Sequence, residues 1–293
     1  MVVPAVAAAA LAAGGAAGWF AVLPLADRLL GRSYARAASW WWESCEAYTA
    51  FKRGHRAREP CADAGGEEGM LAVWRDDALA AAREGSLSRE RAAALAAAGC
   101  DVDVSLAVCD EAALRERRAF SSTPLRRGIC AFGCALWFLA LIVADLPATV
   151  VVAFAVCGVA MAAAVACDVR ARIIPIEACA AIGMAGVVAQ MRLDGMAGLA
   201  AGTAFAALVI VGCVVANRTI GHGEAPCVGR GDVRCMAALS IASGFAAPSG
   251  MLACYVIAAA VSLAGMAAKR LTAKDGIPMA PFLAVWLLVA SLG

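Results

Sequence analysis

The chain has 293 residues, of which 63% are hydrophobic and 16% are charged, and its formal net charge at pH 7 is +2. Because an ordinary globular domain carries about 25% charged residues and about half apolar ones, this composition excludes a wholly soluble protein. The small net charge gives no indication of a nucleic-acid partner. We therefore interpret the chain as an integral membrane protein that is embedded in the lipid bilayer.

The first predicted element is a membrane anchor at the N-terminus. No charged side chain occurs before Asp27. A secretory signal has a basic start and a shorter apolar region, whereas about 20 apolar residues are enough to span a bilayer and remain there. We expect residues 1–31 to form the first transmembrane anchor.

The next segment, residues 32–127, has a different character and is predicted to be a soluble domain. Its acidic and basic residues nearly balance, and the alanine-rich stretches at 69–85 and 88–99 have the composition of helices. Ser88 is a suitable N-cap for the second of these helices. Three adjacent tryptophans, Trp40–Trp42, fit either the membrane interface or the interior of the soluble domain, and the sequence leaves both open.

Residues 128–293 are nearly all apolar and are predicted to form the membrane domain. Seven segments in this part have the composition of membrane helices, and the shorter ones are tolerated within a bundle. Their expected ranges are 128–144, 147–167, 173–190, 196–216, 232–245, 249–268 and 279–293. With the N-terminal anchor, the predicted fold is an all-α, polytopic membrane helix bundle of about eight transmembrane segments, with a small helical cytoplasmic insertion after the first span.

The basic residues near the ends of these segments predict the orientation of the bundle. One set of loops holds ten of them, whereas the opposite set holds only Arg192. The ten are Arg126, Arg127, Arg170, Arg172, Arg218, Arg230, Arg234, Lys269, Arg270 and Lys274. Because basic residues accumulate in cytoplasmic loops, we expect the first set and the soluble domain to face the cytoplasm, in a cytoplasmic (inner or plasma) membrane.

The cysteines and histidines give no indication of a metal site or a disulfide framework. Nine of the 13 cysteines lie between Cys130 and Cys254, where we expect them to pack as small hydrophobic residues. The four in the soluble domain, Cys45, Cys61, Cys100 and Cys109, lack the close spacing of zinc ligands. His222 and Glu224 are interpreted as members of a solvated loop, and neither HExxH nor GxSxG occurs. No metal or other cofactor is therefore expected.

Two acidic residues of the membrane half are expected at the same depth. Asp168 ends the third predicted span and Asp232 begins the sixth, both on the cytoplasmic side. A carboxylate beside hydrocarbon is energetically costly and by default indicates function. Two carboxylates close together tend to share one proton, so that one activates water while the other donates to a carbonyl oxygen, as in aspartic proteolysis. We interpret Asp168 and Asp232 as a candidate catalytic pair.

The residues around each aspartate suit this role, although simpler roles are open. Pro175 is expected in the first turn of the next helix, so that the link from Asp168 makes a tight reversal. Gly229 and Gly231 allow the backbone before Asp232 to turn sharply and to approach a ligand closely. Taken singly, Asp232 is equally suited to cap a helix N-terminus and Asp168 to be solvated at the end of a span.

Three segments in this half resemble motifs of the type IV prepilin peptidases, which are membrane aspartyl proteases of the GxGD class. In that family one aspartate is followed by a short basic stretch and IP, and the similar residues here are Asp168, Arg170, Arg172, Ile174 and Pro175. The second family aspartate lies in GxGDxK, to which Gly229, Gly231, Asp232 and Arg234 correspond, with arginine in place of the usual lysine. A third family motif, IPFGPFL, is similar to IPMAPFL at 277–283.

The resemblance implies an endopeptidase that removes the short basic leader peptide from prepilin or pseudopilin substrates of type IV pili or protein secretion, at the cytoplasmic face. It assigns catalysis to Asp168 and Asp232. The resemblance further implies that the catalytic loop is supported by Pro175, Gly229, Gly231 and Arg234. Bifunctional family members carry paired CxxC motifs in the cytoplasmic domain; residues 32–127 contain none, so methyl transfer is not expected.

Two other functions remain open at this stage. An intramembrane GxGD protease of the presenilin or signal-peptide-peptidase type would act on other substrates, but the PAL motif of those families is absent. A proton-coupled transporter could use the same aspartate pair to carry protons. The sequence shows no inverted repeat of the kind found in many transporters.

Overall fold

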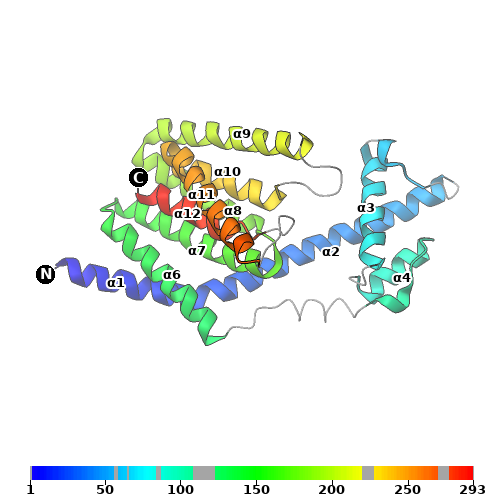
Figure 1. The fold of residues 1–293 in the computed structure, drawn as a ribbon, viewed down its shortest axis with the longest axis horizontal. Coiled ribbons are helices and arrows are strands. Elements are labelled where there is room, and N and C mark those ends of the chain that lie inside the picture. Colours follow the sequence, from blue (N-terminus) through cyan, green and yellow to red (C-terminus); the bar gives the residue numbers. More distant parts are fainter. Residues whose placement is uncertain are drawn as a thin grey trace. The chain divides into compact units, whose positions relative to one another are not determined.

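The computed structural model of the chain describes residues 2–55, 59–64, 66–83, 87–107, 123–219, 228–269 and 277–292. In these ranges the chain forms helices and their connections and no strand, so the predicted all-α class is confirmed for this part (Figure 1). The chain divides into two compact units. Unit 1 comprises Met1–Leu30 and Phe120–Gly293, and unit 2 comprises Gly31–Ala119.

Unit 1 is a bundle of apolar helices. Its elements are α1 (Val2–Ala17), the π-helical turn η1 (Gly18–Val22), the start of α2 (Leu23–Gly54), α6 (Pro124–Val143), α7 (Ala148–Ala171), α8 (Ile176–Leu193), α9 (Gly195–Thr219), α10 (Arg230–Ser243), the short η4 (Gly244–Ala246), α11 (Ala247–Ala267) and α12 (Ala280–Leu292). Each of the seven segments predicted after residue 127 corresponds to one of the helices α6 to α12.

Six stretches of the described chain are long and apolar enough to cross a membrane, which supports a helical membrane bundle but not the predicted count of eight. An α-helix rises about 1.5 Å per residue, so α10 and α12, with 14 and 13 residues, are each about 20 Å long. The hydrocarbon core of a bilayer is about 30 Å thick. Neither helix alone therefore reaches the length of an ordinary span.

The stretch that contains α10 and α11 is a hairpin of two helices. The backbone reverses at Gly244, which has a φ of 54° that a residue with a side chain rarely adopts. Tyr255 of α11 donates a hydrogen bond to the sulfur of Met236 on α10 at 3.5 Å, although the two residues are 19 positions apart in the sequence. Figure 1 shows the two helices running in opposite directions.

Glycines allow α10 to pack closely against its two neighbours. A Cβ atom at Gly186 of α8 would lie 2.6 Å from the Cα atom of Ala242 on α10, and one at Gly202 of α9 would lie 2.6 Å from the carbonyl oxygen of Ser240. Small residues that let helix backbones approach are typical of membrane helix interfaces. The position of Asp232, on the same helix, is therefore fixed by contacts on both sides of α10.

Unit 2 consists of the remainder of α2, the short η2 (Ala62–Ala64), α3 (Gly66–Arg83), α4 (Arg89–Ala97) and η3 (Val104–Leu106). Both helices predicted from the alanine-rich stretches are present, and the Ser88 hydroxyl caps α4 by accepting a hydrogen bond from the Arg91 amide. Trp41 packs against Trp74 in the core, whereas Trp40 is exposed. The interior alternative is thus correct for Trp41.

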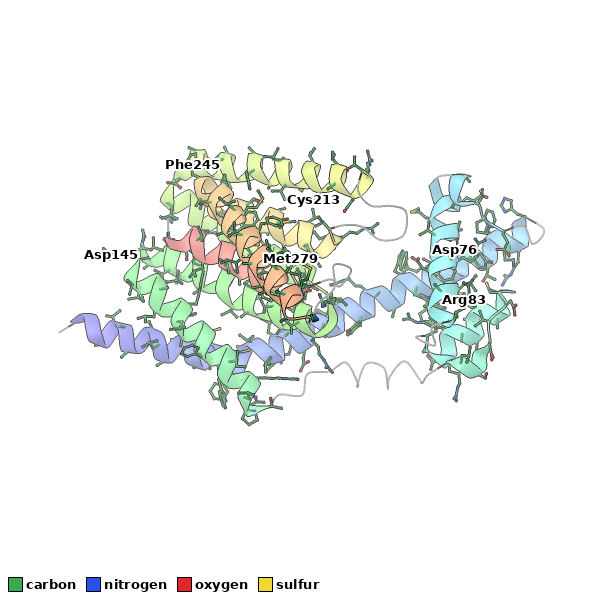
Figure 2. The ribbon with its side chains drawn as sticks, in the orientation of Figure 1. Asp76, Arg83, Asp145, Cys213, Phe245 and Met279 are labelled. Carbon is green, nitrogen blue, oxygen red and sulfur yellow. The ribbon has the colours of Figure 1, made fainter. Side chains whose placement is uncertain are left out.

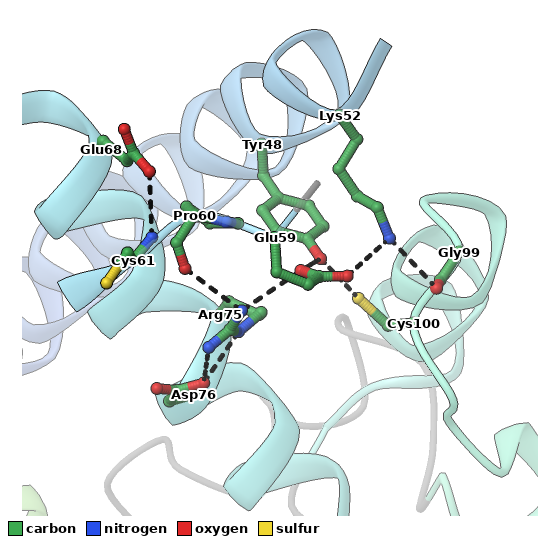
Figure 3. Close-up of polar contacts among 10 residues, drawn as sticks. All are labelled: Tyr48, Lys52, Glu59, Pro60, Cys61, Glu68, Arg75, Asp76, Gly99 and Cys100. Atoms are coloured by element: carbon green, nitrogen blue, oxygen red, sulfur yellow. Dashed lines mark hydrogen bonds and ion pairs between the residues drawn. The ribbon is translucent and has the colours of Figure 1, made fainter. Parts of the chain in front are cut away.

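A polar network in unit 2 is centred on Glu59, which precedes η2 (Figure 3). The Glu59 carboxylate accepts hydrogen bonds from Tyr48 Oη at 2.6 Å, Lys52 Nζ at 2.8 Å and Arg75 Nη1 at 3.2 Å. Arg75 also forms an ion pair with Asp76 at 2.7 Å. Partial burial opposes ionisation, but these hydrogen bonds outweigh it and lower the pKa of Glu59 to about 2. The network joins α2 to α3.

Candidate functional site

Asp168 lies near the end of α7, where the chain makes the predicted tight reversal. α7 ends at Ala171, and Arg172, in a left-handed conformation, donates its backbone N–H to the carbonyl of Asp168 at 2.8 Å. Pro175 is the N-cap of α8 and lies one residue before the helix, not in its first turn as predicted. Its extended ψ of 136° is the reason, because a residue of the first turn would need a helical ψ.

The Asp168 carboxylate is buried and serves the N-terminus of another helix. Its Oδ2 atom accepts a hydrogen bond from the backbone N–H of Ala280, the first residue of α12, at 2.9 Å, and the N–H of Met279 also donates to it. The first residues of a helix leave their N–H groups without partners in the helix. The alternative of a solvated Asp168 is therefore wrong, since the side chain is only 5% exposed.

Asp232 lies in the first turn of α10, half buried, and its carboxylate accepts a hydrogen bond from the backbone N–H of Gly229, the N-cap. Gly229 has a φ of −64°, which any residue adopts, so the predicted sharp turn is not what requires glycine there. Glycine is needed at position 229 because a side chain has no room there: a Cβ atom would lie 2.9 Å from Asp232 Oδ2. At Gly231 a Cβ atom would lie 3.3 Å from the Cβ atom of Ile174, so α10 approaches the reversal after Asp168 closely.

The structure brings Asp168 and Asp232 together, although 63 residues separate them in the sequence. Their carboxylates are close enough for the two negative charges to repel each other. Both charges also act on Cys235, which is fully buried on α10 one turn after Asp232. The third motif, IPMAPFL, reaches Asp168 through the backbone N–H of Ala280. All three segments singled out in the sequence thus converge at one end of unit 1.

Arg234 has a more peripheral place than the aspartates. Its side chain is exposed, and its charge acts on Cys179 of α8. The thiols of Cys179 and Cys235 hydrogen-bond to each other next to Asp232. All 11 cysteines in the described ranges are free, and seven of the eight between Cys130 and Cys254 are buried, as expected of small hydrophobic residues.

Several residues weighed in the sequence lie outside the described residues, namely Cys109, His222, Glu224, Arg270 and Lys274. Within the described ranges, no group of three or more His, Cys, Asp or Glu side chains could hold a metal ion. Sequence reasoning missed the contact between Asp168 and the Ala280 amide. A local signal existed, because IPM supplies no Ser, Thr, Asp or Asn to cap the helix that follows it.

Together, the fold and this site define a helical membrane protein with two carboxylates brought together at one end of its bundle. Comparison of the chain with known protein families, with curated protein sequences and with solved structures finds no match in any of the three.

Proposed function

We propose that the chain is a membrane aspartyl endopeptidase that cleaves the short basic leader peptide from type IV prepilin-like proteins at the cytoplasmic face of the membrane. The observation that supports this most is the convergence of three distant segments. Asp168 with its IP reversal, the GxGD segment around Asp232 and the IPMAPFL segment meet at one end of unit 1. Each of them resembles a motif of the prepilin peptidases.

The chemistry needs one ionised and one protonated carboxyl group in the pair. The carboxylate takes a proton from water, whose oxygen attacks the peptide carbonyl carbon while the protonated partner donates to the carbonyl oxygen. The resulting tetrahedral diol then collapses and the carbon–nitrogen bond breaks. The leaving nitrogen takes the proton held by the first carboxyl, and one diol hydroxyl returns its proton to the second carboxylate as it becomes the carbonyl of the new C-terminus. Asp168 and Asp232 supply both groups because repulsion between neighbouring carboxylates favours sharing of one proton.

The distribution of basic residues supports a cytoplasmic site. Most basic residues of unit 1 lie at the end of the bundle that holds the aspartates. They occur at the starts of α6 and α10 and at the ends of α7, α9 and α11. They are Arg126, Arg127, Arg230, Arg234, Arg170, Arg172, Arg218 and Lys269. Among the described basic residues of unit 1, Arg192 alone lies at the opposite end. In this proposal α10 and α12 are short crossings within the bundle, which gives eight segments, and the soluble unit is cytoplasmic.

The test is co-expression of the protein with a prepilin-like substrate, with cleavage followed as a mobility shift of the substrate. We expect Asp168→Asn and Asp232→Asn each to lower cleavage by about 10³-fold or more, because neither amide can exchange the shared proton. Asn at 168 keeps an oxygen that accepts the Ala280 N–H, so the fold should survive. Asp145→Asn, in an exposed turn at the other end of unit 1, is the matched control and should cleave normally.

Either Asn variant cleaving at the wild-type rate, with equal abundance in the membrane, would show that this pair is not catalytic. A wild-type protein that never cleaves a prepilin but carries protons across vesicles would favour the transporter alternative.

A further inference from the structure

The side chain of Asn217 links the end of α9 to the segment that leads into α10. Its amide nitrogen donates to the carbonyl of Val228 at 3.1 Å, and its Oδ1 atom accepts from the N–H of the same residue at 2.9 Å. The two residues are 11 positions apart in the sequence. Because α9 ends at Thr219 and α10 begins at Arg230, the two hydrogen bonds join separate elements.

The type and the place of residue 217 suit this link. An asparagine amide presents one donor and one acceptor side by side, which match the C=O and N–H of a single backbone residue. Asn217 is half-buried in the last turn of α9. Cys213, one turn earlier on the same helix, is buried, and the charge of Asp232 acts on it (Figure 2). Because positions i and i+4 of a helix share a face, Asn217 lies on the side of α9 that faces α10.

The peptide unit between Val228 and Gly229 connects this link to the candidate site. Its carbonyl oxygen, from Val228, accepts from Asn217. Its N–H, from Gly229, donates to the Asp232 carboxylate. The unit is trans, and a trans peptide unit is planar and rigid, with its C=O and N–H groups on opposite sides. Asn217 therefore holds one edge of the plane, and the opposite edge holds the carboxylate.

The orientation of this peptide plane determines where the Asp232 carboxylate is held. Asp232 is the third residue of α10 and Gly229 is the N-cap, so their contact is the one that a third residue makes in a capping box. Rotation of the plane would turn the N–H away and leave the aspartate free to change its rotamer. A donor on the carbonyl also polarises the peptide unit, which strengthens its N–H as a donor.

We propose that Asn217 is a positioning residue of the catalytic pair, which orients the Val228–Gly229 peptide so that its N–H holds the Asp232 carboxylate in place. This role rests on the proposed peptidase activity. The Asn217 amide bonds to Val228 and acts on the reaction only through Asp232. Position 217 lies outside the three segments that resemble prepilin peptidase motifs, so its role follows from the hydrogen bonds and not from the resemblance.

The first test is the kinetics of Asn217→Leu, which has a similar size but no donor or acceptor, on a prepilin-like substrate. We expect kcat to fall at least about tenfold while KM stays within about twofold, because the lost interaction acts only through the catalytic group. Thr219→Val is the matched control. The Thr219 hydroxyl, at the same end of α9, donates to the Val215 carbonyl of its own helix at 2.9 Å, and its loss should leave kcat unchanged.

Asn217→Asp distinguishes positioning from folding within one protein. A protonated carboxyl has the same donor and acceptor as the amide, whereas the carboxylate loses the donor and repels the Val228 carbonyl. We expect the ratio of its kcat to the wild-type kcat to rise about twofold or more as the pH falls from about 8 to about 5. The ratio should stay constant for Asn217→Leu and for Thr219→Asp, which adds a carboxylate at the same end of α9. A constant ratio for Asn217→Asp would contradict the proposal.

Hydrogen exchange of the Gly229 amide tests the same contact without a substrate. Asn217→Leu should accelerate this exchange at least about tenfold, and Thr219→Val should not. Unchanged exchange in the leucine variant, or accelerated exchange with a wild-type kcat, would overturn the proposal. If the wild-type protein cleaves no prepilin, the peptidase activity is refuted, while accelerated exchange at Gly229 would still support the orientation of Asp232 by Asn217.

Discussion

Replacing Ala280 by proline removes a single hydrogen bond to Asp168 while keeping both aspartates. Ala280 is the first residue of α12, where proline is tolerated because its fixed φ suits the first helical turn. The substitution deletes the N–H that donates to Asp168 Oδ2 at 2.9 Å, and the ring carbon Cδ that replaces the hydrogen forces the carboxylate away from α12. A hydrogen bond to a charged group contributes about 1.5–3 kcal/mol, which corresponds to about 10–100-fold in rate if it holds the carboxylate in its reactive position.

The control is Ala280→Gly, which keeps the N–H and removes only the buried methyl group. Cleavage of a prepilin-like substrate is followed in time for both variants, and thermal unfolding in detergent verifies that each is folded. We expect Ala280→Pro to cleave about 10–100-fold more slowly than Ala280→Gly. A folded proline variant that cleaves as fast as the glycine variant would refute the argument that the α12 backbone positions Asp168.

The remaining predictions concern packing, charge, orientation and metal content. Gly202→Ala should lower the free energy of unfolding by about 1–3 kcal/mol because its Cβ meets α10, whereas Gly212→Ala on the same helix meets nothing within 4 Å and should be neutral or stabilising. The pKa of Glu59 is lowered from 4.5 to about 2, so its contribution to stability is present above pH 4.5 and is lost as the pH falls from 4.5 towards 2. Since Glu59 is half exposed, we expect Glu59→Gln to remove about 1 kcal/mol at pH 7 and little at pH 2, measured by tryptophan fluorescence during denaturation. In a cysteine-free background, a membrane-impermeant reagent should label Asp194→Cys from outside the cell and miss Lys274→Cys; the reverse pattern would invert the proposed orientation. Metal analysis should find far less than about one zinc per chain, and incubation with S-adenosylmethionine should yield no methylated product. About one zinc per chain, or a methylated product, would contradict the interpretation of residues 32–127.

The helices of the membrane half could be predicted because their signal is local. Long runs without charge mark each of them, and the predicted range 196–216 differs from α9 by only a few residues at either end. The length of α2 could not be predicted in this way. It continues to Gly54 through charged residues such as Arg28 and Arg32, so its apolar pattern ends long before the helix does.

The meeting of Asp168 and Asp232 could be predicted from topology alone, since both residues were expected at the same depth. The support of Asp168 by α12 could not, because it depends on which helices become neighbours. The same holds for the surroundings of Gln190. Gln190 is a single polar residue near the end of a predicted span, and only the packing of α8 against α10 leaves its Oε1 atom without a partner.

The position of the candidate site depends on the alternating direction of consecutive helices in unit 1, and Gly244 maintains that alternation. The segments that carry Pro175, Asp232 and Ala280 precede α8, α10 and α12, which all begin at the same end of unit 1. This alternation requires α11 to return antiparallel to α10, and the reversal is made at Gly244, with φ 54° and ψ −123°. Any side chain there would be strained and would also meet Gln190. If α10 continued straight instead, α12 would start at the other end and Ala280 would not reach Asp168.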